Sequence, residues 1–262
     1  MESMKKVIIL LFSFIALSCS KNEDAYIDSI ETDIDFMPVE IYNNSNVSEN
    51  PTLKLKLITR DKFPCHNYSL ITTQSIEDNE LIIRFEKISV PTICLTAIGP
   101  AISYIDLPEK INKVIFINGN IIDKYSIKID KEKVSINIIE NNFTSLLFNQ
   151  TFRYPQNSFA YVSGTNTDDT EIYDRFLEVL RENPNFTEFE FEGEGRIPYP
   201  TISDGHWVNH ASKYFLYTDY EEFQNLKLIL ENFSRENIEE NSGASISIYG
   251  WNNISFHSWL NN

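Results

Sequence analysis

Hydrophobic and polar residues alternate in the first half of the chain, as in strands with one buried face. Leu53, Leu55 and Leu57 are separated by Lys54 and Lys56, which is the period of two that a strand requires. Apolar runs bounded by turn residues predict seven strands, at 53–58, 68–73, 81–88, 102–105, 114–117, 125–129 and 134–139. Asn118-Gly119 predicts a two-residue hairpin turn, because both residues tolerate a positive φ.

Short strands separated by turns predict an all-β, immunoglobulin-like sandwich over residues 51–150. The polar segment 19–50 is expected to act as a tether, although Ile34, Phe36, Val39 and Ile41 have strand spacing within it. A sandwich of this kind usually holds another module at a distance. Its architecture alone implies no site.

Near residue 150 the pattern changes to mixed helix and strand. Apolar residues fall on one helical face in two segments, namely Ile172, Phe176, Val179, Leu180 and then Phe223, Leu226, Leu230, Phe233. Asp168 with Glu171, and Thr218 with Glu221, have capping-box spacing at the starts of these helices. The predicted strands are 159–163, 188–192, 213–217, 245–249 and 254–259.

This order, β-α-β, a long loop and then β-α-β-β, predicts an α+β plait over residues 151–262. One antiparallel sheet would carry both helices on the same face. The fold class expected for the whole chain is therefore mixed, with an all-β sandwich followed by an α+β domain.

An apolar run from Val7 to Ala16 follows the basic pair Lys5 and Lys6. This is typical of a signal peptide, and it is too short to cross a membrane, which takes about 20 apolar residues. Ser18 and Cys19 come next, followed by a polar and acidic segment.

This arrangement resembles a bacterial lipoprotein signal, and the sequence SKNED after it resembles the surface-export signal of Bacteroidota lipoproteins. The resemblance implies that residues 1–18 are removed and that Cys19 is lipidated. The protein would then be an outer-membrane lipoprotein, on the cell surface or the periplasmic face, with the membrane as a partner through the lipid anchor. The alternative is an ordinary secreted protein with a free Cys19.

The net charge of the chain limits which partners it can bind. The formal net charge is -16, so we expect no binding to nucleic acid, whose phosphates would be repelled. Apart from Cys19, the chain has Cys65 and Cys94, and export to an oxidising compartment predicts that they pair. Two unpaired buried thiols are the alternative.

The loop at 193–210 is the most unusual stretch, because it is long and has no helix or strand pattern. Aromatic and polar side chains in it suit a glycan or a peptide, and the candidate ligand-binding residues are Arg196, Tyr199, Asp204, His206 and Trp207. The alternative is a packed loop in which Tyr199 and Trp207 only cover the sheet.

Other chemistry has weaker support. His206 and His210 would share a face of a helix, but no glutamate follows His206 as a zinc protease motif requires. We therefore expect neither a metal site nor a cofactor, and no catalytic residue is singled out. The function expected is a membrane-anchored binding module acting on a glycan or protein ligand. The alternatives are a hydrolase of carbohydrate or peptide and a structural component of the envelope.

Overall fold

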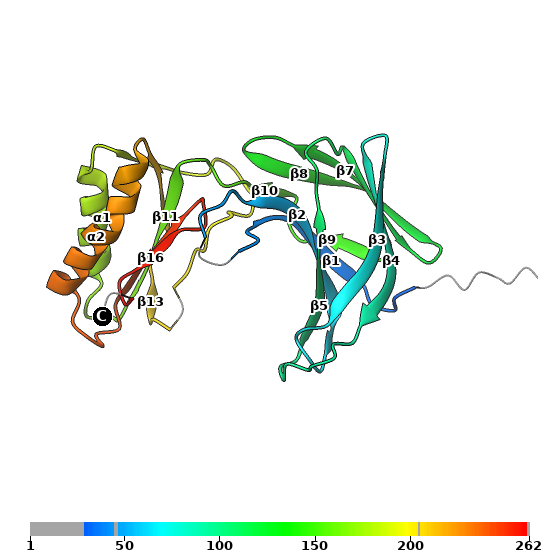
Figure 1. The fold of residues 1–262 in the computed structure, drawn as a ribbon, viewed down its shortest axis with the longest axis horizontal. Helices are drawn as coiled ribbons and strands as arrows, with labels where there is room; N and C mark the ends of the chain where they lie inside the picture. The colour runs from blue at the N-terminus through cyan, green and yellow to red at the C-terminus, as the bar shows by residue number, and fades with distance from the viewer. Residues whose placement is uncertain (1–28, 45–46, 204, 261–262) are drawn as a thin grey trace, which may run out of the picture.

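The computed structural model describes residues 29–44, 47–203 and 205–260. Strands make up 46% and helices 13%, and two parts lie side by side, one all-β and one with two helices (Figure 1). The expected mixture of an all-β part and an α+β part is therefore present. The predicted signal peptide, Cys19 and Asp204 lie outside the described residues.

The all-β part contains ten strands in two sheets. They are β1 (Ile34–Ile41), β2 (Thr52–Phe63), β3 (Ser69–Glu77), β4 (Glu80–Ser89), β5 (Gly99–Asp106), β6 (Lys113–Asn118), β7 (Ile121–Ile129), β8 (Lys133–Glu140), β9 (Thr144–Leu146) and β10 (Gln150–Phe152). The first sheet has the order β5-β2-β1-β9 and the second β10-β8-β7-β6-β4-β3. All seven strands predicted between residues 53 and 139 are present.

The two sheets enclose one hydrophobic core. Alternating residues point into it, for example Leu55 and Leu57 from β2 and Phe116 from β6, and none of these three is exposed. Aromatic rings meet edge to face at its centre, with the Phe36 and Tyr125 centroids 4.7 Å apart. The sheets also meet at one edge, where Ser103 Oγ of β5 donates to Leu70 O of β3 at 2.6 Å.

The immunoglobulin-like arrangement is not confirmed. That fold divides seven strands between two antiparallel sheets joined by Greek-key connections. Here the sheets have four and six strands, and each contains a parallel pair, β1 with β9 and β4 with β6. Alternation identifies strands and their buried faces but carries no information on which strands become neighbours.

The segment expected to be a tether contributes to this core. β1 lies between β2 and β9, and Ile34 and Phe36 are fully buried. Ile30, shortly before β1 in the sequence, is bound by the Asn118 side chain. Asn118 Nδ2 donates to Ile30 O at 2.9 Å, and its Oδ1 accepts from Ile30 N at 2.8 Å. Asn118 therefore pairs with backbone, and the two turn residues are Gly119 and Asn120, one position later than predicted, with Gly119 at φ 59°.

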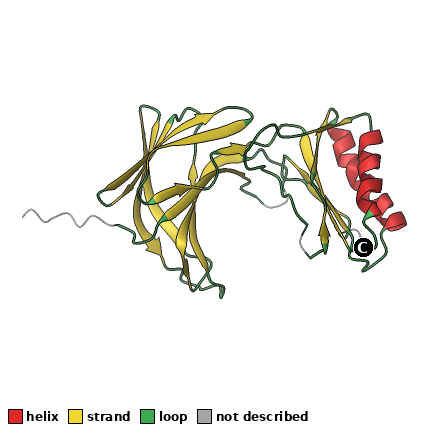
Figure 2. Cartoon of the chain, turned by 180° about the vertical axis from the view of Figure 1, so that it is seen from behind, coloured by secondary structure: helices red, strands yellow, loops and turns green. Residues whose placement is uncertain are grey.

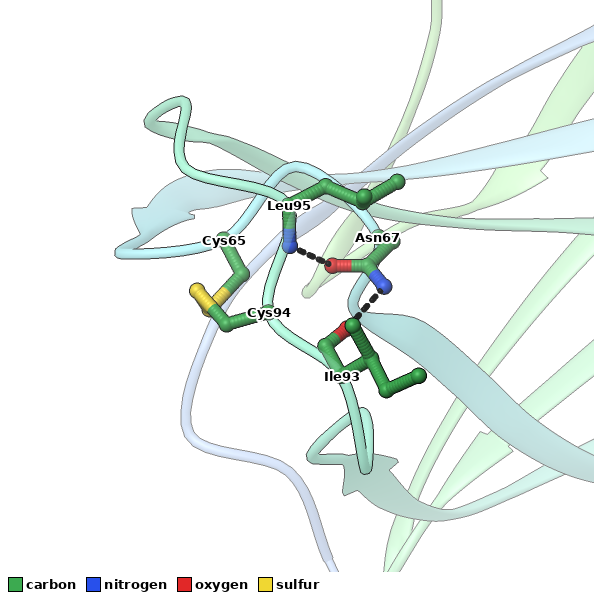
Figure 3. The surroundings of a disulfide bond; sticks show 5 residues. All are labelled: Cys65, Asn67, Ile93, Cys94 and Leu95. Carbon is green, nitrogen blue, oxygen red and sulfur yellow. Dashed lines mark hydrogen bonds between the residues drawn. A yellow bond between two sulfur atoms is a disulfide. The ribbon is translucent and has the colours of Figure 1, made fainter.

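The predicted Cys65–Cys94 disulfide is present (Figure 3). It joins the end of β2 to the loop between β4 and β5. A sequence separation of 29 corresponds to a stabilisation of about 3–4 kcal/mol in the chain-entropy model.

The α+β part begins after β10 and contains two helices over one sheet. Its elements are β11 (Ser158–Thr165), α1 (Glu171–Glu182), β12 (Phe186–Phe189), β13 (Val208–Asn209), β14 (Lys213–Tyr217), α2 (Tyr220–Asn237), β15 (Ser245–Gly250) and β16 (Ser255–His257). The strand order is β12-β14-β11-β15-β16, with β13 beside β11. Every pair is antiparallel, and both helices cover the same face (Figure 2).

Both helices begin one or two residues from the predicted caps. The residue before α1 is Thr170, which makes no side-chain cap hydrogen bond. The N-cap of α2 is Asp219, whose carboxylate accepts from Glu221 N at 2.8 Å. Asp219 competes with Thr218 because aspartate is at least as good an N-cap as threonine.

The two parts are joined by hydrogen bonds as well as by the chain. Arg196 of the long loop exchanges backbone hydrogen bonds of 2.9 Å with Gln150 and Phe152 of β10. On the other side, Tyr42 Oη donates to Trp251 O at 2.6 Å. The long loop and the segment after β1 thus fix the α+β part against the all-β part.

Candidate functional site

The sheet of the α+β part has one face under the helices and one face without them. Phe159 and Tyr161 point toward the helices, while Ala160 and Val162 point to the opposite face. Part of that opposite face is covered by Tyr199, whose ring lies 4.7 Å from Tyr154 and 5.9 Å from Tyr214. The part left uncovered carries small and polar side chains.

A groove of about 1200 Å³ begins where the cover by Tyr199 ends. Residues 200–203 and His206 form one wall, and the end of α2 with segment 238–244 forms another. Strand β15 and Trp259 complete it. Six serines are among the lining residues, namely Ser203, Ser234, Ser242, Ser245, Ser247 and Ser258.

His206 is held in one orientation against the sheet. Its Nδ1 bonds to Gly243 O, and because a carbonyl only accepts, Nδ1 carries the proton. In the neutral ring Nε2 accepts, and Ser245 Oγ then donates to it at 2.6 Å while Ser203 Oγ donates to Ser245 Oγ at 2.9 Å. The ring lies directly on Gly164, where an added Cβ would be 2.8 Å from it.

A second histidine lies farther along the same face. His257 Nδ1 is 3.1 Å from Ser247 Oγ and its Nε2 is 3.2 Å from Ser255 Oγ. Burial lowers the pKa of His257, so this imidazole is neutral at neutral pH. The Trp259 ring lies 4.7 Å from it and is half exposed, which leaves an aromatic surface at the edge of the groove.

Comparisons with protein-family models, curated proteins and solved structures found no match. The chemistry of the groove is therefore the observation that bears on function. Hydroxyl and imidazole groups beside an indole ring suit a polar, hydroxyl-bearing ligand. Among the described lining residues, three glutamates stand against one arginine, which disfavours an anionic ligand; they are Glu231, Glu239, Glu240 and Arg235.

The structure separates the four predicted ligand-binding residues that it describes, Arg196, Tyr199, His206 and Trp207. Tyr199 is 3% exposed and belongs to the core of the open face, whereas Trp207 is 80% exposed and does not line the groove as the described residues form it. Arg196 lies at the junction with β10. Of the four that are described, only His206 lines the groove.

The burial of Tyr199 gives no support to its predicted role as a ligand-binding residue. The Tyr199 ring packs in the cluster of the open face with Ala160, Val162 and Tyr214, and its Oη bonds to Ser158 Oγ at 2.7 Å. For Tyr199 the alternative reading, a packed loop residue, holds.

Several residues of the groove were not predicted, chiefly Ser245, Ser247 and Trp259. A signal for two of them exists, because Ser245, Ile246, Ser247 and Ile248 alternate strictly. Isoleucine on one face and serine on the other indicate a strand whose second face is not filled by core side chains. Trp259 has no such signal, since its exposure depends on how the last strand pairs.

Within residues 29–44, 47–203 and 205–260, no group of three or more His, Cys, Asp or Glu residues is arranged to hold a metal ion. His206 and His210 also do not converge. His210 stacks on Tyr173 of α1 with centroids 4.5 Å apart and bonds to Thr165 Oγ1 at 2.9 Å. In the same part of the chain no helix is long and apolar enough to cross a membrane.

Proposed function

We propose that the protein is a membrane-anchored lipoprotein that binds a neutral glycan in the serine-lined groove of its α+β part. The groove itself carries this proposal. Thr201, Ser242 and Ser258, the groove hydroxyls that are not buried, offer donors and acceptors to sugar hydroxyls. Trp259 offers a flat ring of the kind on which sugar rings pack. Part of the long loop, residues 200–203 and His206, forms one wall.

The anchor is the other half of the proposal. The signal-like stretch ending at Cys19 supports lipidation, and the chain enters the all-β part through a segment that pairs with Asn118. The all-β part would act as a spacer, as bacterial immunoglobulin-like modules do. Its two sheets with one common core and its fixed junction with the α+β part suit that role.

Hydrolysis is the second candidate, because Ser245 donates to a histidine as a catalytic serine does. Two observations disfavour it. Ser245 is only 5% exposed, and its Oγ is already flanked by Ser203 and His206. A substrate carbonyl or anomeric carbon would have to displace this packing to reach Oγ, whereas a bound sugar would not.

Binding is tested by screening the purified protein on a glycan array and measuring each hit by calorimetry. We expect Trp259→Ala to weaken binding at least tenfold, since it removes the aromatic surface of the groove. Trp207→Ala is the matched control, an exposed tryptophan outside the groove, and it should leave the affinity unchanged. Equal effects of the two substitutions would contradict the groove as the site.

Two further measurements separate the remaining candidates. Membrane fractionation of the native protein and Cys19→Ala should show the variant released as soluble protein. Incubation of any bound glycan with native protein and Ser245→Ala should give no cleavage in either case, and cleavage by the native protein alone would establish the hydrolase.

A further inference from the structure

The loop between β4 and β5 exposes an unusual amount of aliphatic surface. Val90, Ile93, Leu95 and Ile98 are 70%, 75%, 48% and 76% exposed. Aliphatic side chains scattered singly over a surface are ordinary, but four within nine residues mark a contact surface. We refer to residues 89–98 as the aliphatic loop.

The aliphatic loop is held open by covalent and polar contacts. Cys94 is bonded to Cys65, and the Asn67 side chain forms hydrogen bonds to the loop on both sides of Cys94. Its Nδ2 donates to Ile93 O at 2.7 Å and its Oδ1 accepts from Leu95 N at 3.2 Å. In Figure 3 the side chains of Ile93 and Leu95 lie on the side of the loop away from the disulfide.

This fixed shape matters because an apolar loop that was free would fold back to bury its own side chains. A loop preorganised with its aliphatic groups outward loses little conformational entropy when a partner covers them. The disulfide and the two hydrogen bonds of Asn67 therefore favour a role of the aliphatic loop in binding.

The composition of the loop indicates which partner covers it. No charged residue occurs between Lys87 and Asp106 in the sequence, although the chain as a whole is strongly charged. Protein interfaces depend mainly on Trp, Tyr and Arg, with Leu and Val under-represented, and the aliphatic loop has none of the first three. A charge-free tip whose large exposed side chains are all aliphatic, with Thr92 and Thr96 as its exposed polar residues, matches the acyl region of a lipid bilayer.

The start of the described chain lies close to this loop. Ser29 borders the same surface hollow as Lys87 and Ile88, the residues of β4 that lead into the loop. Cys19 precedes Ser29 by 10 residues (29 minus 19), which span at most about 36 Å when extended. An anchor at Cys19 therefore keeps the loop within reach of the bilayer.

From these observations we infer that the aliphatic loop inserts into the membrane leaflet that holds the anchor. The inference rests on the proposed lipid anchor. Anchor and loop together would give the protein two membrane contacts, which limits how it can tilt. Lys87, exposed beside the loop, is placed to meet a lipid phosphate group.

The test uses residues 20–262, which carry neither the apolar run 7–16 nor Cys19 and so have no anchor, and vesicles of phosphatidylethanolamine and phosphatidylcholine. We expect flotation to show binding that changes little with salt, because the contact is apolar. Ile93→Ser with Ile98→Ser should reduce binding at least tenfold, and so should the single substitution Ile98→Asp. Ile138→Ser with Ile139→Ser, two exposed aliphatic residues of β8, is the matched control and should bind as before.

Circular dichroism and melting temperature establish that each variant is folded. Absence of vesicle binding by the anchor-free chain, or equal binding by loop and control variants, would overturn the inference. Because this chain has no lipid, the result is independent of the fractionation and glycan tests. Lipidation at Cys19 can therefore be confirmed while membrane insertion of the aliphatic loop is rejected, and insertion can be confirmed while lipidation is rejected.

Discussion

At the scale of single side chains, Tyr199 and Trp207 show that residue type alone does not predict whether a side chain is buried. Both are aromatic residues of one loop, yet one ring is buried between Tyr154 and Tyr214 and the other is in solvent. The difference depends on which residues of the loop touch the sheet. That is a tertiary property, and the spacing of prolines and glycines in the loop does not reveal it.

The two aromatic residues should therefore differ in their effect on stability. Tyr199→Ala removes a buried ring and leaves a cavity, so we expect a loss of about 3–5 kcal/mol in the free energy of unfolding. Trp207→Ala should change it by about 0.5 kcal/mol or less. Urea denaturation of both variants measures this, and similar losses would mean that Trp207 is packed in solution.

His210 should make stability depend on pH. Burial against Tyr173 lowers its pKa, which Asp174 partly offsets. The unfolded chain, with a histidine pKa of about 6.5, then binds more protons than the folded protein as the pH falls. The stability contributed by the neutral imidazole is complete above about pH 7 and is lost toward the lower folded pKa.

The melting temperature of the native protein should consequently fall more between about pH 7.5 and pH 5.5 than that of His210→Asn. The variant should keep a smaller dependence of the melting temperature on pH, because burial also lowers the pKa of His257. Identical slopes would show that His210 is accessible to solvent and protons in the folded state.

At the scale of elements, period and length explain which strands the sequence reveals. The seven strands predicted in the all-β part were found because each runs over six or more residues with an alternating or apolar pattern. β9, β10 and β13 were missed, and they have three, three and two residues. Segments this short carry no measurable period, and only their pairing partners make them strands.

Arg153 connects several of these elements just after β10. Its Nε donates to Glu40 Oε1 of β1 at 2.9 Å, and its Nη1 donates to Glu109 and to Asp130 O. The Glu40 side chain is almost completely buried. Without the guanidinium, this carboxylate would keep only the hydrogen bond from Tyr154 N.

Arg153→Met should therefore lower the free energy of unfolding by about 3–5 kcal/mol, as when one partner of a buried ion pair is removed. Arg60→Met is the control, because Arg60 makes an ion pair of the same length with Asp35 whose side chains are more exposed than those of Arg153 and Glu40, so that about 1 kcal/mol or less is expected. If the two substitutions cost the same in chemical denaturation, the Glu40 pair is hydrated.

At the scale of the whole molecule, the two parts have separate cores but a shared boundary. One hydrophobic cluster lies entirely before residue 150, and two others lie entirely after residue 153. The hydrogen bonds of Tyr42 and Arg196 cross between them. The hydrophobic pattern of the sequence also changes near residue 150, while these crossing contacts involve residues with no distinguishing pattern.

Residues 153–262 expressed alone should fold cooperatively, because both of their clusters are complete without the all-β part. We expect a lower melting temperature than in the full chain, since Trp251 and Arg196 lose their partners. Circular dichroism and a thermal melt of the fragment measure both properties. A fragment without a cooperative transition would show that the junction is required for folding.

Strand β1 also has a mechanical consequence. It lies parallel to β9, and Ile34 N and Phe36 O bond to Phe143 and Leu147. A pull on the N-terminal end of β1, opposed by a pull on the chain beyond β9, would draw these neighbours in opposite directions along their length. Their hydrogen bonds would then resist together in shear instead of opening one by one. Pulling single molecules from Ser29 and Leu260 should therefore show one high-force event for the all-β part, and gradual opening at low force would contradict this.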